Sequence, residues 1–182
     1  MERLRKYFNS AVAVMLLLVT ATVNVACGGD DDEEDNGGSQ KVYVKTVKMS
    51  ATVEPTADLL NLADITLSYT DDQGANVTQT VTSEKHTLNA EITKFPANGT
   101  VTYTLKLKTN ANIDASKAYK LSGGMKINLT SLMSDGTTGG FYSSGSSSTI
   151  DIPGNKVEEW LSKYAANTYS VKIDKDGGLP SL

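Results

Sequence analysis

Two residue types that often carry chemistry occur once each in this chain: cysteine, at Cys27, and histidine, at His86. One histidine cannot build a histidine-rich zinc site. A Ser-His-Asp triad could be built only around His86, and the sequence has no Gly-x-Ser-x-Gly turn. His86 is in phase with Leu88 and Ile92, so we expect a partly buried structural histidine. These counts predict no catalytic residue, no metal site and no cofactor. For haem, the one way of ligating the iron that they leave open is His86 together with a methionine.

Paired carboxylates are the other candidate chemistry, since a glycosidase can work with two of them. The pairs are Asp71-Asp72, Glu158-Glu159 and Asp174-x-Asp176-Gly-Gly178. We expect them at turns or on an exposed helix face. The last pair is also a fragment of a calcium loop, but such loops use more ligands, which favours a C-terminal turn. An enzyme is therefore not expected, and a carboxylate-based glycosidase is the least favoured alternative.

Binding chemistry is most concentrated between Ser134 and Ser148, a stretch of glycine, serine and threonine with Phe141 and Tyr142 in its middle. Its composition predicts a long loop. Aromatic rings among small polar residues are what adaptable binding loops use, so Phe141 and Tyr142 are the candidate ligand contacts. The alternative is that one ring packs onto the edge of the core as a plug.

The N-terminus has the layout of a secretory signal, which we place at residues 1–26. Arg3, Arg5 and Lys6 precede a mostly apolar run from Ala11 to Val23. That run is about 13 residues long, where roughly 20 are needed to span a membrane as a helix. A cleaved signal is therefore predicted rather than a transmembrane anchor.

Cys27 is best explained as a lipid attachment point. A lone cysteine cannot form an internal disulfide and would be a liability in an exported chain. Asn24-Val-Ala-Cys27 resembles the lipobox of bacterial lipoproteins, with small Ala26 before the cysteine and Asn24 where leucine is usual. The resemblance implies acylation of Cys27 by fatty acids such as palmitate, and each buried methylene would contribute about 0.8 kcal/mol to membrane binding.

An acidic run follows the cysteine. It lies within residues 27–40, a segment that has no apolar residue after Cys27 and is predicted to be a disordered tether. As a flexible coil it spans roughly 20 Å, and up to about 45 Å when extended. The run resembles the surface-export signal of Bacteroidota lipoproteins, which implies an outer-membrane location facing the cell exterior; the alternative is a simple solvated spacer. Its six acids are Asp30, Asp31, Asp32, Glu33, Glu34 and Asp35.

The acidic run holds the whole negative charge of the mature chain. Of 17 basic and 21 acidic residues, three and one lie in the signal segment and six acids lie in the tether, which leaves the remaining domain with 14 of each. All basic residues of that domain are lysines. A neutral domain without arginine is a poor match for nucleic acid, so no nucleic-acid partner is expected.

Residues 41–182 form a single predicted domain whose apolar residues alternate with a period of two. The alternation is cleanest from Val101 to Leu107, and it also places Tyr43, Val47, Met49, Ala51 and Val53 together on the core face of their strand. A bulge is predicted at Lys45-Thr46 and a kink at Gly123-Gly124. Turns are predicted at 71–74 and 96–99. The predicted strands cover 43–53, 63–69, 77–81, 86–92, 101–107, 119–129, 150–152 and 169–173.

One helix interrupts the strands, from Asn155 as N-cap, with Glu158 reaching back, to an end near Asn167. Its apolar face would be Val157, Trp160, Leu161 and Tyr164. Seven or eight strands and one short helix near the C-terminus predict an all-β fold, a two-sheet antiparallel sandwich of immunoglobulin-like type.

These features together favour a lipid-anchored cell-surface module that binds without catalysing, with glycan or a surface protein as partner and the membrane held through Cys27. The binding loops are expected at the end of the sandwich away from the tether. The alternative is a structural or adhesive subunit resembling the fimbrial lipoproteins of the same bacteria. Those are matured by cleavage after arginine, and this chain has no arginine after Arg5.

Overall fold

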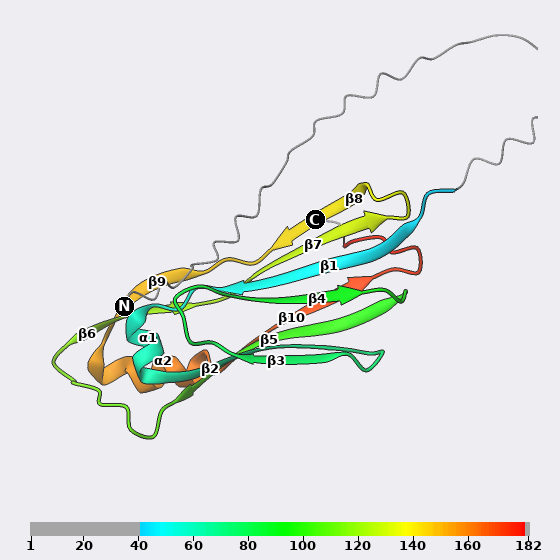
Figure 1. The fold of residues 1–182 in the computed structure, drawn as a ribbon. Helices are drawn as coiled ribbons and strands as arrows, with labels where there is room; N and C mark the ends of the chain where they lie inside the picture. Colours follow the sequence, from blue (N-terminus) through cyan, green and yellow to red (C-terminus); the bar gives the residue numbers. More distant parts are fainter. Residues whose placement is uncertain (1–40, 181–182) are drawn as a thin grey trace, which may run out of the picture. The chain divides into compact units, whose positions relative to one another are not determined.

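The computed structural model describes residues 41–180, which contain ten strands in two main layers (Figure 1). The signal segment, Cys27 and the acidic run lie outside the described residues. The strands are β1 Val44–Val53, β2 Ala63–Asp71, β3 Asn76–Thr80, β4 His86–Ile92, β5 Ala97–Leu107, β6 Ala118–Gly123, β7 Lys126–Met133, β8 Thr138–Ser144, β9 Ser148–Pro153 and β10 Ala166–Ile173. The helices are α1 Ala57–Leu62, the 3-10 turn η1 Gly154–Lys156 and α2 Val157–Lys163.

Two four-stranded sheets make the sandwich. Sheet A has the order β4-β1-β7-β8, sheet B has the order β10-β5-β2-β3, and every pairing is antiparallel. The predicted all-β, two-sheet antiparallel sandwich is therefore confirmed. Its immunoglobulin-like character is not confirmed. In the immunoglobulin fold the first strand, A, lies at the edge of the sheet with strand order ABED, whereas β1 lies between β4 and β7.

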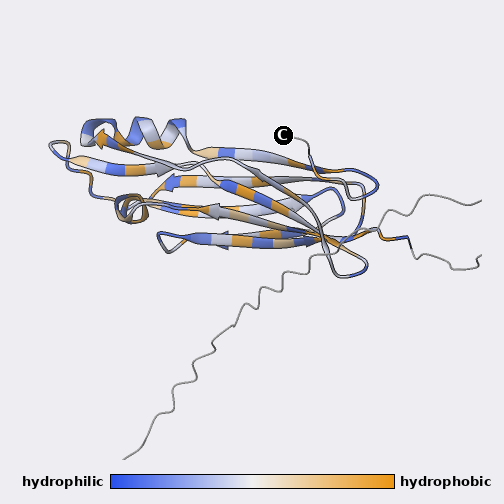
Figure 2. Ribbon diagram, turned by 90° about the horizontal axis from the view of Figure 1, so that it is seen from above, coloured by the Kyte–Doolittle hydropathy of each residue, from blue (hydrophilic) through white to orange (hydrophobic). Residues whose placement is uncertain are grey.

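The core lies between the two sheets and follows the predicted alternation, visible as alternating colours along the strands in Figure 2. On β5, Val101, Tyr103 and Leu105 are buried while the residues between them face outward. Each fully buried aliphatic side chain contributes about 1.5–3 kcal/mol relative to an exposed one. The predicted bulge is confirmed by a shift of register between Val44 and Thr46. Tyr43 precedes that bulge and is 62% exposed, so its predicted place on the core face is wrong.

A long two-stranded ribbon is formed by β6 and β7 on one side and β8 and β9 on the other. Ile127 pairs with Ser144 and Gly123 pairs with Ser148, so the register continues across the break without gaining or losing a residue. The break falls at Gly124, within the predicted kink, where φ is +100°. The ribbon thus leaves sheet A at the glycine and continues as the separate pair β6-β9 beside α1.

The C-terminal helix buries the predicted face but begins and ends differently. Val157, Trp160 and Leu161 are buried, whereas Tyr164 is 38% exposed and lies against the Trp160 ring. The predicted capping box is wrong, because η1 precedes the helix and its N-cap position makes no side-chain hydrogen bond. The chain has already turned into β10 at Asn167.

Two other local predictions are corrected. Asn98 and Gly99 belong to β5 and pair with β10, so the predicted turn at 96–99 is wrong. Gly99 lies against Tyr69, whose ring would be 2.7 Å from an added Cβ, and this close approach explains the glycine. Helix α1 was not predicted because six residues are too few for a clear helical period. Thr56 caps it by accepting a hydrogen bond from the Leu59 amide.

Two buried tyrosines should make the domain sensitive to alkali. Tyr69 and Tyr103 are 1% and 2% exposed, and burial raises the pKa of both phenols well above the ordinary value near 10. Because the unfolded chain ionises first, their contribution to stability is complete below about pH 10 and is lost above it. Urea denaturation between pH 8 and 11 should show this loss. Tyr103→Phe should reduce the slope, and an unchanged slope in that variant would contradict the role of the buried phenol.

Candidate functional site

Phe141 and Tyr142 lie in a strand rather than a loop. The stretch predicted as a loop contains β8, which pairs with β7 from Thr138 to Ser144. The loop prediction is wrong here because glycine and serine conceal the alternation of inward and outward positions. Only pairing with β7, whose apolar pattern is strong, brings the strand into sheet A.

The two rings point to opposite faces of sheet A. Tyr142 is 9% exposed, and its hydroxyl is hydrogen-bonded to that of Tyr169 on β10, which closes one side of the sandwich. Phe141 is 68% exposed on the outer face. Of the two predicted ligand contacts, only Phe141 is therefore presented to solvent, and the plug alternative describes Tyr142.

The opposite side of the sandwich is closed by the only histidine. His86 Nε2 lies 2.9 Å from Gln79 Oε1, which joins β4 to β3. The half-buried ring is thus engaged between the two sheets, as the structural interpretation of His86 predicted.

The register of sheet A aligns outward residues from all four strands in rows. One row runs Glu91, Lys48, Thr130 and Phe141 from β4 to β8. The next row runs Asn89, Ser50, Asn128 and Ser143. We call these eight residues the ladder face. Because neighbouring strands are about 4.8 Å apart, each row extends over roughly 14 Å.

A shallow depression of about 220 Å³ lies on the ladder face beside the row that ends at Phe141. Its polar lining consists of Lys48, Ser50, Asn89, Glu91, Asn128 and Thr130. Lys48 and Glu91 balance each other in charge, and the remaining groups are amides and hydroxyls. The Asn128 amide is 3.4 Å from Ser50 Oγ, which leaves most of its hydrogen-bonding capacity unused.

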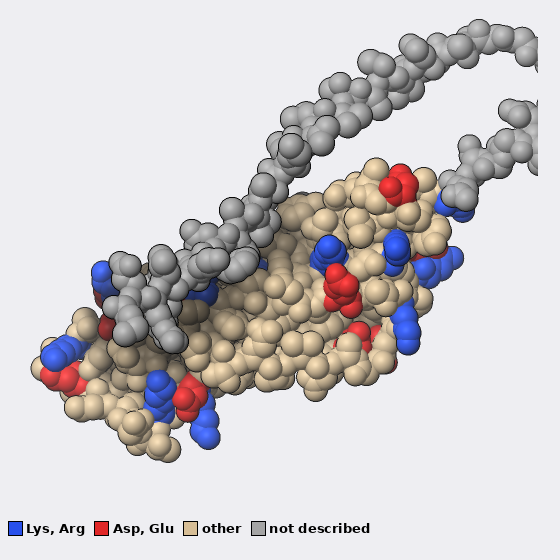
Figure 3. Space-filling model, in the orientation of Figure 1, with Lys and Arg blue, Asp and Glu red and all other residues tan. Residues whose placement is uncertain are grey.

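In Figure 3 much of the visible face carries no charged side chain. An exposed ring beside uncommitted amides and hydroxyls can stack on one face of a ligand while donating and accepting hydrogen bonds along the rest. The shallow shape suits an extended chain rather than an enclosed small molecule.

Two of the three predicted carboxylate pairs serve turns, and the third, Glu158-Glu159, is exposed on α2. Asp71 Oδ1 accepts hydrogen bonds from the amides of Gln73 and Ala75, at 3.0 and 2.8 Å. The Asn98 side-chain amide donates to Asp72 and holds the pKa of that carboxyl below its usual value. Asp174 Oδ1 accepts from the amide of Gly178 at 2.7 Å. Within residues 41–180, no group of three or more potential metal-binding His, Cys, Asp or Glu side chains occurs.

Asn89 and Asn128 were missed by sequence reasoning, although a signal was present. Asparagine is disfavoured in strands, and both residues occupy outward positions of predicted strands. Their alignment could not be seen, because it depends on the order β4-β1-β7, which places Asn128 beside Ser50 although they are 78 residues apart.

No helix among the described residues is long and apolar enough to cross a membrane. Comparison of the chain with protein-family models, with curated proteins and with solved structures finds no match.

Proposed function

We propose that this protein is a non-catalytic, lipid-anchored surface module that binds neutral glycan chains on the ladder face of sheet A. The observation that carries the proposal is Phe141, which is 68% exposed at the end of a row of polar side chains on four neighbouring strands. Acylated Cys27 would hold the module at the outer membrane, and the acidic run Asp30–Asp35 would direct it to the exterior.

A glycan is favoured over a protein because of the composition of the face. The buried centre of a protein interface is enriched in aromatic and apolar groups and depleted of charge. On the ladder face only Phe141 is a large exposed apolar residue, and the centre is occupied by Lys48, Ser50, Asn128 and Thr130. Amides and hydroxyls of this kind match the hydroxyl groups of a sugar chain, and the ring matches its apolar face.

One observation favours the alternative, a structural or adhesive fimbria-like subunit. Strand β8 ends sheet A, and Thr138–Ser144 contains no charged residue. Proteins usually protect such edges with charges, because an open edge can pair with a strand of another chain. Sedimentation over a concentration series separates the two functions, since subunit assembly requires association that glycan binding does not.

Phe141→Ala should weaken glycan binding at least tenfold, which corresponds to about 1.4 kcal/mol. The loss is expected because the variant removes the stacking ring, while stability should change by no more than about 0.5 kcal/mol at so exposed a site. Affinity electrophoresis in a panel of neutral polysaccharides measures the effect. Tyr43→Ala is the matched control, since Tyr43 is 62% exposed but lies outside the ladder face. Equal loss in the two variants would refute the assignment.

A further inference from the structure

A second cleft, separate from the ladder face, lies near the C-terminal end of β1. It has a volume of about 400 Å³ and is formed by α1, the segment after β5 and the start of β6 (Figure 1). Its polar lining consists of Asp58, Asn61, Lys108, Asn110, Asn112 and Tyr119. We call it the end cleft, and its volume is within the range of small-ligand pockets.

Opposite charges line the end cleft without pairing. Lys108 Nζ donates to the carbonyl oxygen of Leu60 at 2.6 Å, and Asp58 Oδ2 accepts from the amide of Lys120 at 2.7 Å. Neither residue takes part in any salt bridge between described residues. Backbone groups thus engage a half-buried ammonium and a half-buried carboxylate, and neither has an ionic partner among the described residues.

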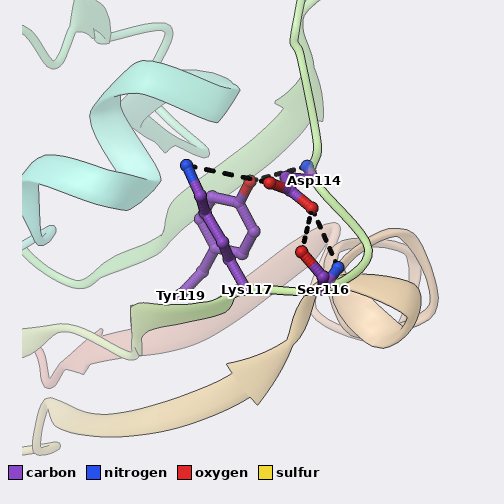
Figure 4. Close-up of polar contacts among 4 residues, drawn as sticks. All are labelled: Asp114, Ser116, Lys117 and Tyr119. Atoms are coloured by element: carbon purple, nitrogen blue, oxygen red, sulfur yellow. Dashed lines mark hydrogen bonds and ion pairs between the residues drawn. The ribbon is translucent and has the colours of Figure 1, made fainter.

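The wall that carries Tyr119 is rigidly held. The Tyr119 hydroxyl accepts a hydrogen bond from the amide of Asp114 at 2.8 Å, and Figure 4 shows Ser116 and Lys117 meeting the Asp114 carboxylate. Ser116 donates to Asp114 from both its amide and its hydroxyl, at 2.9 and 2.6 Å. The amide of Gly154 in turn binds the carbonyl of Lys117 at 2.7 Å. A wall fixed before binding lowers the entropic cost of binding a ligand.

Three asparagines supply the remaining hydrogen-bonding capacity. The side chains of Asn61, Asn110 and Asn112 form no hydrogen bond with another described residue. Each amide offers donors and an acceptor, as vicinal sugar hydroxyls require. Lys108 adds a positive charge that a neutral sugar does not need, and Asp58 would repel a doubly charged phosphate more strongly than a singly charged carboxylate.

We infer that the end cleft binds an acidic sugar, with the sugar carboxylate on Lys108 and its hydroxyls on Asp58 and the three asparagines. The cleft thereby gives the module a second site, which recognises a singly charged uronic acid residue rather than the neutral chain assigned to the ladder face.

Trigalacturonate and its fully methyl-esterified form test the inference, because they have the same backbone and differ in charge. In calorimetric titration of the wild type, the acid should bind at least tenfold more tightly than the ester, and the difference should shrink as salt is added. This comparison needs no variant. Equal binding of acid and ester, or no binding of the acid, would overturn the inference.

Variants then locate the site. Lys108→Met should abolish the preference for the acid, and Lys106→Met should preserve it, since Lys106 is an exposed lysine of β5 outside the cleft lining. Thermal melting checks that both variants fold. Retained acid preference in a folded Lys108→Met variant would also overturn the inference. Phe141→Ala should leave acid binding intact. Failure of the ladder-face proposal is detected in a separate measurement, the binding of neutral polysaccharides.

Discussion

Gly124→Ala should destabilise the domain by about 3 kcal/mol or more. Gly124 has φ of +100°, a conformation that costs an L-residue about 1–3 kcal/mol. In addition, a Cβ at this position would lie 2.2 Å from the carbonyl oxygen of Ser146. That oxygen is backbone, so β8–β9 would have to shift away from β6–β7 and the long ribbon would lose its register.

Gly136→Ala is the matched control, and urea denaturation is the measurement. Gly136 also has positive φ, +86°, but no atom lies within 4 Å of a Cβ built on it. Gly136→Ala should therefore lower the free energy of unfolding by only about 1–2 kcal/mol, which is the cost of the backbone conformation alone. Equal losses for the two variants would mean that close contact between the ribbon's backbones does not determine the bend.

Cys27→Ser should release the protein from the membrane fraction almost completely. The proposed acyl chains would each contribute about 0.8 kcal/mol per buried methylene, and serine cannot receive them in the same reaction. Fractionation of cells followed by immunoblotting measures the effect. Retention of the Cys27→Ser variant in the membrane would contradict the lipid anchor.

A second pair of variants separates anchoring from export. Replacing Asp30–Asp35 with serine and asparagine should leave the protein membrane-bound while protecting it from protease added to intact cells. The matched control removes six charges from the described domain instead of the tether. Continued cleavage of the tether variant would show that the acidic run is only a spacer.

The sequence predicted those features that depend on local period and glycine content. Alternation on β1 and β5 placed Met49, Ala51, Tyr103 and Leu105 in the core, and all four are buried. The bulge near Lys45-Thr46 followed from a change of phase, and the kink at Gly123-Gly124 followed from its two glycines, although the predicted strand 119–129 is divided there into β6 and β7. Each of these is set within about ten residues of chain.

Features that depend on distant pairing were missed. Strand β8 has few apolar residues and is defined by its pairing with β7, so its composition indicated a loop. Asn98 and Gly99 look like a turn, yet β5 continues through them because Tyr69 packs over the glycine. The ladder face and the end cleft likewise unite strands and loops whose relative positions follow only from the order of the sheets.

The most direct measurement of the central claim is an NMR titration of the ¹⁵N-labelled Cys27→Ser protein with a neutral oligosaccharide of the best-binding polysaccharide. Binding on the ladder face should produce saturable shifts at the amides of Ser50, Asn128 and Phe141. Amides of Thr102 and Thr104, on the outer face of sheet B, should stay unchanged. Saturable shifts confined to sheet B, or none in any strand of sheet A, would contradict the proposed function.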